Sequence, residues 1–409
     1  MKPSCFFLLF FISFLALAAP DDPRRDAPEL GSRAAVLLDA ATGVILYSKN
    51  GNEEIPPASL TKLMTIHVVL TEAAARGISA EERWDLPRES WARNQPPRSS
   101  LMRIGPGQRA NLRELLLGLA VPSGNDAAVA AALRFYPRVE EFTRRMNEEA
   151  RRLGLVKTRF TEPSGISEYN ITTAEEFALF CREYLRLHPE TLESLHSVRE
   201  FTYPTEANRE SPSGGGGPTT HYNRNSLLGR VEGVDGLKTG YIDEAGYNIA
   251  LTAERGGSRF IAVVLGAPAE YGGDRIRDAD GERLLEWAFA HYKTLRPALP
   301  AIPPVRVWKG REAALDLVPA SGPVCTVLAH RGSAPLRWEI EVRNPVIAPV
   351  TAAAPLGQLI LSDREGELRR IPLLAASAVE QGGFFKRLWD TLVLFLTGMI
   401  RAAGPGNTP

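Results

Sequence analysis

The sequence predicts an α/β domain, then a small all-β domain, then a terminal amphipathic helix. Apolar runs typical of strands stand at both ends of residues 28–296, with helical patterns between them, so one sheet is expected to unite the two ends. A proline cluster over residues 297–304 marks a boundary, and beyond it apolar and polar residues alternate. The 409-residue chain is 44% apolar and is long enough to bury a core of this size.

The elements of the first domain follow in order. Ala34–Asp39 and Val44–Ser48, joined by Ala-Thr-Gly, indicate a hairpin. Helical patterns begin after Pro56-Pro57-Ala58 and continue to about residue 187. A second strand pair is expected over Tyr247–Glu254 and Arg259–Leu265, and a helix from about residue 278 to 292 closes the domain.

The second domain, residues 303–377, is expected to be all β. Leu336–Arg343 alternates without a break, and Gln358–Leu361 with Leu368–Leu374 predicts a hairpin. No catalytic constellation is apparent in it. Ser211–Thr219, in the first domain, reads as a flexible surface insertion without chemistry.

Residues 1–18 have the pattern of a cleaved signal peptide. Lys2 supplies a positive charge, Cys5–Ala19 is an apolar run that is short for a bilayer span, and Ala16-Leu17-Ala18 is an A-x-A cleavage site. We therefore expect secretion. The alternative is an uncleaved anchor.

Residues 383–402 predict an amphipathic helix that lies in the plane of a membrane. Apolar residues recur at helical spacing, whereas Lys386, Arg387 and Asp390 fall largely on the opposite side. Burying the apolar face is worth on the order of 10 kcal/mol, more than about 1 kcal/mol per basic residue. Gly382-Gly383 is expected to set the helix apart from the fold. The alternative is an ordinary helix packed on its own domain.

Charge and cysteine content argue against several classes of protein. The 48 basic and 48 acidic residues balance, so nucleic acid is not expected as a partner. Three cysteines and six histidines form no CxxC pair and no HExxH helix, so neither a metal nor another cofactor is expected. Cys181 and Cys325 lie in different predicted domains and are expected to be buried and unpaired.

The first motif is Ser59-Leu60-Thr61-Lys62, at the start of the first long helix. Residues i and i+3 share one helix face, so the lysine amine can reach the serine oxygen. Free backbone N–H groups at a helix N-terminus suit a developing oxyanion. This pattern alone is common.

Two further motifs follow along the chain. Ser123-Gly124-Asn125 offers a hydroxyl and an amide two residues apart on a loop; the alternative is a helix cap. Lys238-Thr239-Gly240 offers a cation and a hydroxyl that can grip a carboxylate on an edge strand, and Gly240 permits close approach of backbone or ligand. The alternative is a turn.

The three motifs together resemble the active-site triad S-x-x-K, S-D-N and K-T-G of the penicillin-interacting serine enzymes. Longer segments are similar to the D-alanyl-D-alanine carboxypeptidases, the low-molecular-mass penicillin-binding proteins. These segments are Pro57–Thr65, Ser100–Met102, Pro122–Asp126, Asn223–Asn225 and Val234–Gly240. The resemblance covers residues 30–295 and implies a penicillin-binding-protein/β-lactamase-like fold, with an antiparallel sheet flanked by a helical subdomain. The β domain and terminal helix resemble the family's membrane-anchored members.

The resemblance also implies roles for the site residues. Ser59 is the expected acylated nucleophile, Lys62 its base, and Ser123 a relay toward the leaving amine. Asn125 is expected to bind the substrate backbone, and the N–H groups of Ser59 and Tyr241 to form the oxyanion hole. Residues expected around the substrate carboxylate are Lys238, Thr239, Gly240, Arg224 and Arg277.

The base has to lose its proton near neutral pH. An ordinary lysine has a pKa of about 10.4. We expect the pKa of Lys62 to be lowered to about 8 by partial burial and by a second cation, with Lys238 as the obvious candidate. Arginine cannot replace Lys62, because it does not deprotonate.

The chain departs from the family pattern in three places. Tyr241-Ile242 follow the third motif where the family often has His-Thr, which affects the rates expected for acylation and deacylation. Ala128 stands where the family has a cysteine, and the family's Asn-Pro/His-Gly-Leu segment reads Glu162-Pro-Ser-Gly-Ile166 here, a close but imperfect match.

The leading hypothesis is a serine D-Ala-D-Ala carboxypeptidase that trims peptidoglycan pentapeptides and is acylated by penicillins. Its expected partners are peptidoglycan stem peptides, β-lactams and a membrane surface, at the periplasmic face of the cytoplasmic membrane. A DD-endopeptidase is the alternative, although such enzymes usually lack the β domain and anchor. A class A β-lactamase would have S-D-N, whereas residue 124 is glycine, and a non-catalytic wall-binding scaffold would not need Ser59 and Lys62.

Overall fold

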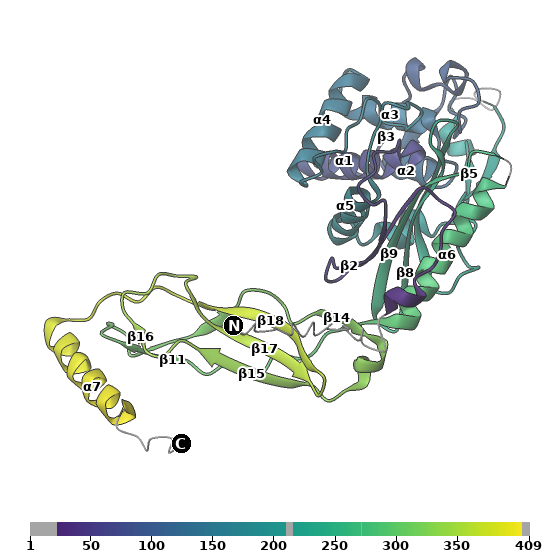
Figure 1. Ribbon diagram of the computed structural model, residues 1–409. Helices are drawn as coiled ribbons and strands as arrows, with labels where there is room; N and C mark the ends of the chain where they lie inside the picture. Colours follow the sequence, from purple (N-terminus) through teal and green to yellow (C-terminus); the bar gives the residue numbers. More distant parts are fainter. Residues whose placement is uncertain (1–22, 210–215, 271, 403–409) are drawn as a thin grey trace, which may run out of the picture.

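The computed structural model describes residues 23–209, 216–270 and 272–402, which form two domains and a terminal helix. The second domain extends at an angle from one end of the first, and the terminal helix lies at its far end (Figure 1). The predicted signal peptide, residues 1–18, lies outside the described residues. The same holds for the predicted surface insertion up to residue 215.

The first domain is built on a five-stranded antiparallel sheet, so the predicted fold class is confirmed. β1 (Ala34–Asp39) pairs with β9 (Ser258–Ala267), which places Val36 opposite Val263. The sheet therefore unites the beginning and the end of the domain, as the strand patterns predicted. In spatial order its strands are β2 (Ile45–Lys49), β1 (Ala34–Asp39), β9 (Ser258–Ala267), β8 (Gly246–Arg255) and β7 (Val234–Ile242).

Helices cover both faces of this sheet (Figure 1). α6 (Gly273–His291) packs against β8 and β9, and α5 (Ala174–Leu187) packs against β1 and β9. Alternate residues of β1 accordingly enter different cores: Val36 belongs to the core on the α5 side, Leu37 to the core on the α6 side. Because both faces are buried, the strand reads as an unbroken apolar run.

The remaining helices of this domain share the core on the α5 side of the sheet. The first of them, α1 (Thr61–Arg76), is buried along most of its length. It is terminated by Gly77, which adopts the left-handed conformation with a φ of 63°. Two short ribbons, β3–β4 (Arg83–Asp85 and Arg109–Asn111) and β5–β6 (Glu200–Tyr203 and Thr219–Tyr222), lie between the helices along the chain. The helices are α1 (Thr61–Arg76), α2 (Leu112–Ala120), α3 (Asn125–Phe135) and α4 (Val139–Arg152).

The second domain is all β, as predicted. The predicted hairpin around residues 358–374 is formed by β17 (Pro355–Asp363) and β18 (Gly366–Ala375), whose side chains Leu359, Ile371 and Leu373 are fully buried in the core of the domain. A small sheet has the order β12 (Ala314–Leu315), β11 (Val305–Trp308), β16 (Val346–Ile347). A larger sheet has the order β13 (Leu317–Pro319), β18 (Gly366–Ala375), β17 (Pro355–Asp363), β15 (Arg337–Val342).

Paired strands join the two domains across the proline-rich boundary. After α6, which starts earlier than expected, β10 (Tyr292–Leu295) runs antiparallel to β14 (Cys325–Leu328) of the second domain. The hydroxyl oxygens of Thr42 and Thr326 lie 2.6 Å apart, and Thr294 donates a hydrogen bond to the carboxylate of Asp39. The junction is therefore hydrogen-bonded on both sides of the boundary.

Cys181 and Cys325 are both buried and free, as expected. Cys181 lies in α5 within the first domain, and Cys325 lies in β14 of the second. Burial raises the pKa of both thiols. Neither is therefore suited to act as a nucleophile.

The terminal helix, α7 (Phe384–Ala402), exposes its apolar side and fastens its polar side to the β domain. Phe385 is 84% exposed and Trp389 65%, whereas Asp390 is 4% exposed and accepts a hydrogen bond from the Lys309 backbone at 2.6 Å. The expectation that Gly382-Gly383 sets the helix apart is wrong, because Gly382 N also donates to Lys309 O. Within the described ranges, no helix has the length and hydropathy to cross a membrane.

Candidate active site

Ser59 and Lys62 meet where the central helix of the first domain begins. Ser59 lies in a 3-10 turn, η2 (Ala58–Leu60), that leads directly into α1. Lys62 Nζ lies 3.1 Å from Ser59 Oγ. When Lys62 is neutral, its amine is within reach to accept the serine proton.

Three acceptors hold the amine of Lys62 in a buried site. Besides Ser59 Oγ, it donates to Asn125 Oδ1 at 2.8 Å and to the Ser164 carbonyl at 2.5 Å. Its side chain is fully buried. The pKa of Lys62 is lowered to about 7, chiefly by burial, with Arg224 acting in the same direction and Glu162 and Asp126 acting against it.

The predicted causes of the lowered Lys62 pKa are confirmed in part: burial is the main cause, but the second cation is a different residue. We expected partial burial and the charge of Lys238 as causes. Burial is complete and is the largest cause, and the cation that adds to it is Arg224. Complete burial is a consequence of tertiary packing, which a motif four residues long does not reveal.

The turn Glu162–Ile166 supplies the carbonyl that binds Lys62. The Glu162 carboxylate accepts hydrogen bonds from Ser164 N at 2.7 Å and Gly165 N at 2.6 Å. Gly165 has a φ of +81°, and a Cβ there would lie 1.9 Å from Ala58 O. Only glycine allows this turn to press against the residue that precedes Ser59.

The second motif lies between α2 and α3. α3 begins at Asn125, and its N-cap, Gly124, makes no side-chain cap hydrogen bond, so the capping alternative is wrong. Ser123 has a φ of 64°, and its hydroxyl is buried without a hydrogen-bond partner among the described residues. An unpaired buried hydroxyl costs stability, which is typical of a group reserved for function.

Asp126 organises the loop in front of the site, a role that the sequence analysis missed. Its carboxylate accepts hydrogen bonds from the backbone N–H groups of Met102 at 2.7 Å, Arg103 at 2.8 Å and Ile104 at 3.0 Å. Burial raises the pKa of Asp126 against the effect of these bonds. The only signal in the sequence is an acidic residue directly after Asn125, and its partners lie more than 20 residues away.

The third motif lies in the middle of β7, an edge strand of the sheet, and not in a turn. Lys238 is buried, and its amine donates to Thr239 O at 3.0 Å. Burial lowers the pKa of Lys238 well below its ordinary value, with further lowering by nearby cations, Lys62 first. A Cβ on Gly240 would lie 3.0 Å from Ser59 N, so the glycine lets β7 run directly beside the nucleophile.

Two cavities meet at Ser59. The cationic cavity, of about 440 Å³, is lined by Ser59, Ser123, Thr239, Gly240, Tyr241, Arg224 and Arg277, together with Arg98, Ser100, Tyr247 and Asp274. The outer cavity, of about 220 Å³, is lined by Ser59, Asn125, Gly165, Ile166, Tyr241 and Ile242, together with residues 97–100, Asp243 and Glu244.

Both predicted arginines lie in the cationic cavity. Arg224 Nε donates to Pro122 O at 3.1 Å, and Arg277 Nε donates to Asp278 Oδ1 at 2.8 Å. The Arg277 guanidinium also lies over the Tyr247 ring, 5.8 Å from its centre. Fixed cations in a partly enclosed site favour a carboxylate ligand.

The structure thus brings the predicted site residues together around one serine, although Lys238 is buried in β7 and lines neither cavity. A nucleophile with a neighbouring base, N–H groups at a helix start and a cationic cavity suit acyl transfer from a substrate that carries a carboxylate near the scissile bond. In the described part of the chain, no cluster of three or more His, Cys, Asp or Glu side chains is arranged to hold a metal ion.

Comparisons with known proteins agree with this chemistry. Residues 22–269 match the D-alanyl-D-alanine carboxypeptidase family. The chain is 32% identical to the D-alanyl-D-alanine carboxypeptidase DacC of Escherichia coli, over 93% of this chain and 94% of that protein. It is 32% identical to DacF of Bacillus subtilis, over 92% and 93% respectively. The fold superposes on penicillin binding protein 5 from Haemophilus influenzae with a TM-score of 0.75 at 27% identity, covering 87% of this chain and 99% of that structure.

Proposed function

The chain belongs to the D-alanyl-D-alanine carboxypeptidase family, and from this premise we propose that it is a serine carboxypeptidase that removes the terminal D-alanine of peptidoglycan pentapeptides. The observation that carries the proposal is the buried amine of Lys62, 3.1 Å from Ser59 Oγ, beside a cavity lined by Arg224 and Arg277. No metal or other cofactor takes part in the proposed reaction.

In the first half-reaction, neutral Lys62 takes the proton of Ser59, and Ser59 Oγ attacks the carbonyl between the two D-alanines. The backbone N–H groups of Ser59 and Tyr241 stabilise the oxyanion. As the C–N bond breaks, the proton taken by Lys62 is relayed to the departing D-alanine amine by Ser123, whose hydroxyl is buried without a hydrogen-bond partner among the described residues. Water then hydrolyses the acyl-enzyme and regenerates the serine.

Binding orients the peptide across the serine. Thr239 and Arg277 line the cationic cavity, which receives the terminal carboxylate, and Lys238 lies next to Thr239 on β7. Asn125, already bound to Lys62 through Oδ1, has its amide nitrogen available to the substrate backbone. A penicillin carries a carboxylate close to a strained amide, so it fits the same site and acylates Ser59.

The first test uses the full-length chain in detergent and a D-Ala-D-Ala pentapeptide. Release of free D-alanine is expected from the wild type and from Ser194→Ala, an exposed control serine, but not from Ser59→Ala. Fluorescent penicillin should label the first two proteins and not the third. Labelling without D-alanine release from a monomeric pentapeptide would favour the DD-endopeptidase. The absence of both labelling and D-alanine release would contradict the proposed chemistry.

We also propose that the enzyme works at the periplasmic face of the cytoplasmic membrane, held there by α7. Support comes from the exposed apolar side of α7, where Phe385 and Trp389 are 84% and 65% exposed, while Asp390 is bound to the β domain. Exposed apolar side chains of this kind suit burial at the boundary between headgroups and acyl chains.

Vesicle flotation tests this attachment. The wild type should float with anionic vesicles even at high salt, because apolar burial outweighs the basic residues. Replacing Phe385 and Trp389 with serine should abolish flotation, whereas serine at Leu299 and Val318, which are 42% and 45% exposed outside α7, should not. Secretion should remove residues 1–18, which N-terminal sequencing of the mature protein would show.

A further inference from the structure

A chain of contacts crosses the mouth of the site and has no role in the reaction described above. The Tyr241 hydroxyl donates to Asp243 Oδ1 at 2.6 Å, and Asp243 Oδ2 lies 3.6 Å from the Arg98 guanidinium. Arg98 belongs to the loop held by the helical part of the domain, and Asp243 follows β7 on the sheet side. Arg98 and Tyr241 line both cavities, so the contacts lie where the two cavities meet.

The direction of the substrate follows from the charges of the two cavities, and this step rests on the proposed function. With the terminal carboxylate in the cationic cavity and the scissile bond at Ser59, the residues that precede the two D-alanines extend into the outer cavity. The charged side chains of that cavity are Asp243, Glu244 and Arg98.

The ion pair between Arg98 and Asp243 is weak enough for a ligand to replace it. Its side chains are 81% and 58% exposed, and the 3.6 Å separation is longer than a direct charge-assisted hydrogen bond. Exposed pairs of this kind contribute little to stability, so a ligand can open them at small cost. A ligand that brings both an ammonium and a carboxylate restores both interactions after opening the pair.

We propose that Arg98 and Asp243 form a specificity subsite for the diamino acid that precedes the two D-alanines. The subsite selects a side chain that ends in both an ammonium and a carboxylate, as in meso-diaminopimelate, over one that ends in an ammonium alone, as in lysine. Asp243 and Glu244 bind the ammonium, and Arg98 binds the carboxylate.

Tyr241 has a positioning role in this subsite, because its hydroxyl fixes the carboxylate of Asp243. Its ring is also held, by packing against Tyr247 with 4.3 Å between ring centres. Tyr241, which stands after the third motif where the family often has histidine, thus has a role for its side chain. Its backbone N–H would be supplied by any residue.

The test compares pentapeptides that differ only at the third residue: meso-diaminopimelate, the same residue with its side-chain carboxylate amidated, and L-lysine. With the full-length enzyme, kcat/KM for D-alanine release should be about fivefold higher for the first peptide than for the second, the size expected of one exposed charge-assisted contact. In Arg98→Gln this ratio should fall to about one, because the guanidinium that distinguishes the peptides is gone.

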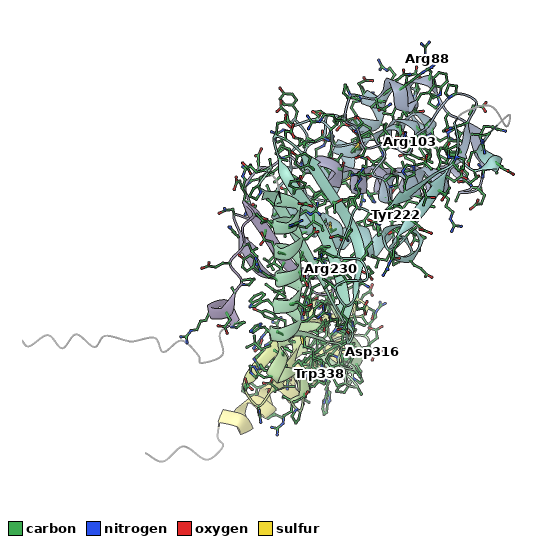
Figure 2. The ribbon with its side chains drawn as sticks, turned by 90° about the vertical axis from the view of Figure 1, so that its right-hand side faces the viewer. Arg88, Arg103, Tyr222, Arg230, Asp316 and Trp338 are labelled. Atoms are coloured by element: carbon green, nitrogen blue, oxygen red, sulfur yellow. The ribbon has the colours of Figure 1, made fainter. Side chains whose placement is uncertain are left out.

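A matched control and an internal reference keep the result specific. Arg88→Gln makes the same change of charge at the outer end of the domain (Figure 2) and should keep the wild-type ratio. Acylation by penicillin, which has no diamino-acid side chain, is measured for every variant, and selectivity is expressed relative to it. Asp243→Asn should weaken both ammonium-bearing peptides relative to an Nε-acetyl-lysine peptide.

Equal kcat/KM for the meso-diaminopimelate and amidated peptides in the wild type would overturn the proposal, as would an unchanged ratio in Arg98→Gln. If no peptide releases D-alanine, the proposed function fails instead. The three peptides are then compared as competitors of penicillin labelling at Ser59, and the same fivefold order among them would still support the subsite.

Discussion

Acylation of Ser59 by penicillin should rise with pH and reach half of its maximum near pH 7. The reason is the pKa of Lys62, which burial lowers from 10.5 to about 7. On that basis, about 1% of the amine is neutral at pH 5, about half at pH 7 and about 99% at pH 9. An ordinary lysine would be neutral in only about 0.03% of molecules at pH 7, so burial supplies about a thousandfold more base.

The free-energy scale of this effect follows from the same values. Lowering a pKa from 10.5 to about 7 disfavours the charged amine by about 5 kcal/mol. Full burial is the main cause, and Arg224 acts in the same direction. Arg224→Gln should therefore move the midpoint to higher pH, besides weakening binding of the penicillin carboxylate.

The assay is the second-order rate constant for labelling by a fluorescent penicillin between pH 5 and 9, with Ser59→Ala as the blank. At pH 5 the rate constant should be about a hundredfold below its maximum. A fall in this rate constant at the alkaline end would indicate that the cations that bind the penicillin carboxylate lose their charge. A flat profile from pH 5 to 8, or a tenfold rise per pH unit up to pH 9, would refute the assignment of Lys62 as a base whose pKa is lowered by burial.

Three other substitutions have expected outcomes. Lys62→Met should abolish labelling yet raise the free energy of unfolding, measured by urea titration, by about 2–4 kcal/mol at pH 6. Between pH 7 and 10.5 the unfolded wild type binds more protons than the folded wild type, so the stability of the wild type rises with pH. The advantage of the variant over the wild type should therefore be smaller at pH 9. Gly165→Ala should lower the free energy of unfolding by about 2 kcal/mol or more and reduce labelling, because the new Cβ would lie 1.9 Å from Ala58 O. Gly154→Ala is the control: Gly154 has a φ of +77° but open space around it, so this variant should lose stability, measured by thermal unfolding, only through backbone strain. Asp126→Asn, which leaves one oxygen for several backbone N–H groups, should cost about 2 kcal/mol and lower kcat/KM, while Asp316→Asn in the β domain (Figure 2) should change neither.

Elements whose structure is decided by local pattern were predicted best from the sequence. The hairpin of β1 and β2, the strand pair of β8 and β9 and the alternating strands of the second domain were all predicted within a few residues. Buried strands read as apolar runs and half-buried ones as alternation, so the signal is carried by neighbouring residues.

The site was predictable only as far as its motifs reach. The spacing of Ser59 and Lys62 already implies one helix face, and their 3.1 Å contact agrees with that geometry. Burial was predicted as a cause of the lowered Lys62 pKa, but its full extent and the role of Arg224 were not, because the groups around the amine include the Ser164 carbonyl, about 100 residues away along the chain. The Arg98–Asp243 contact likewise joins segments that no periodicity connects.

The terminal helix shows the same limit. Its apolar face was evident from the spacing of its residues, but the partner of Asp390, the backbone of Lys309, was not. A single carboxylate on the polar side reads as solvated unless the fold is known.

The paired strands at the domain junction determine how far the enzyme can reach. β10 and β14, together with the contact between Thr42 and Thr326, leave no free tether between the catalytic domain and the β domain, and Asp390 fastens α7 to the other end. With α7 lying on a membrane as proposed, Ser59 is carried at one fixed height as the protein diffuses laterally. The enzyme then acts only on pentapeptides at that distance from the membrane. Pentapeptides closer to the membrane or farther from it keep their terminal D-alanine, whatever the amount of enzyme.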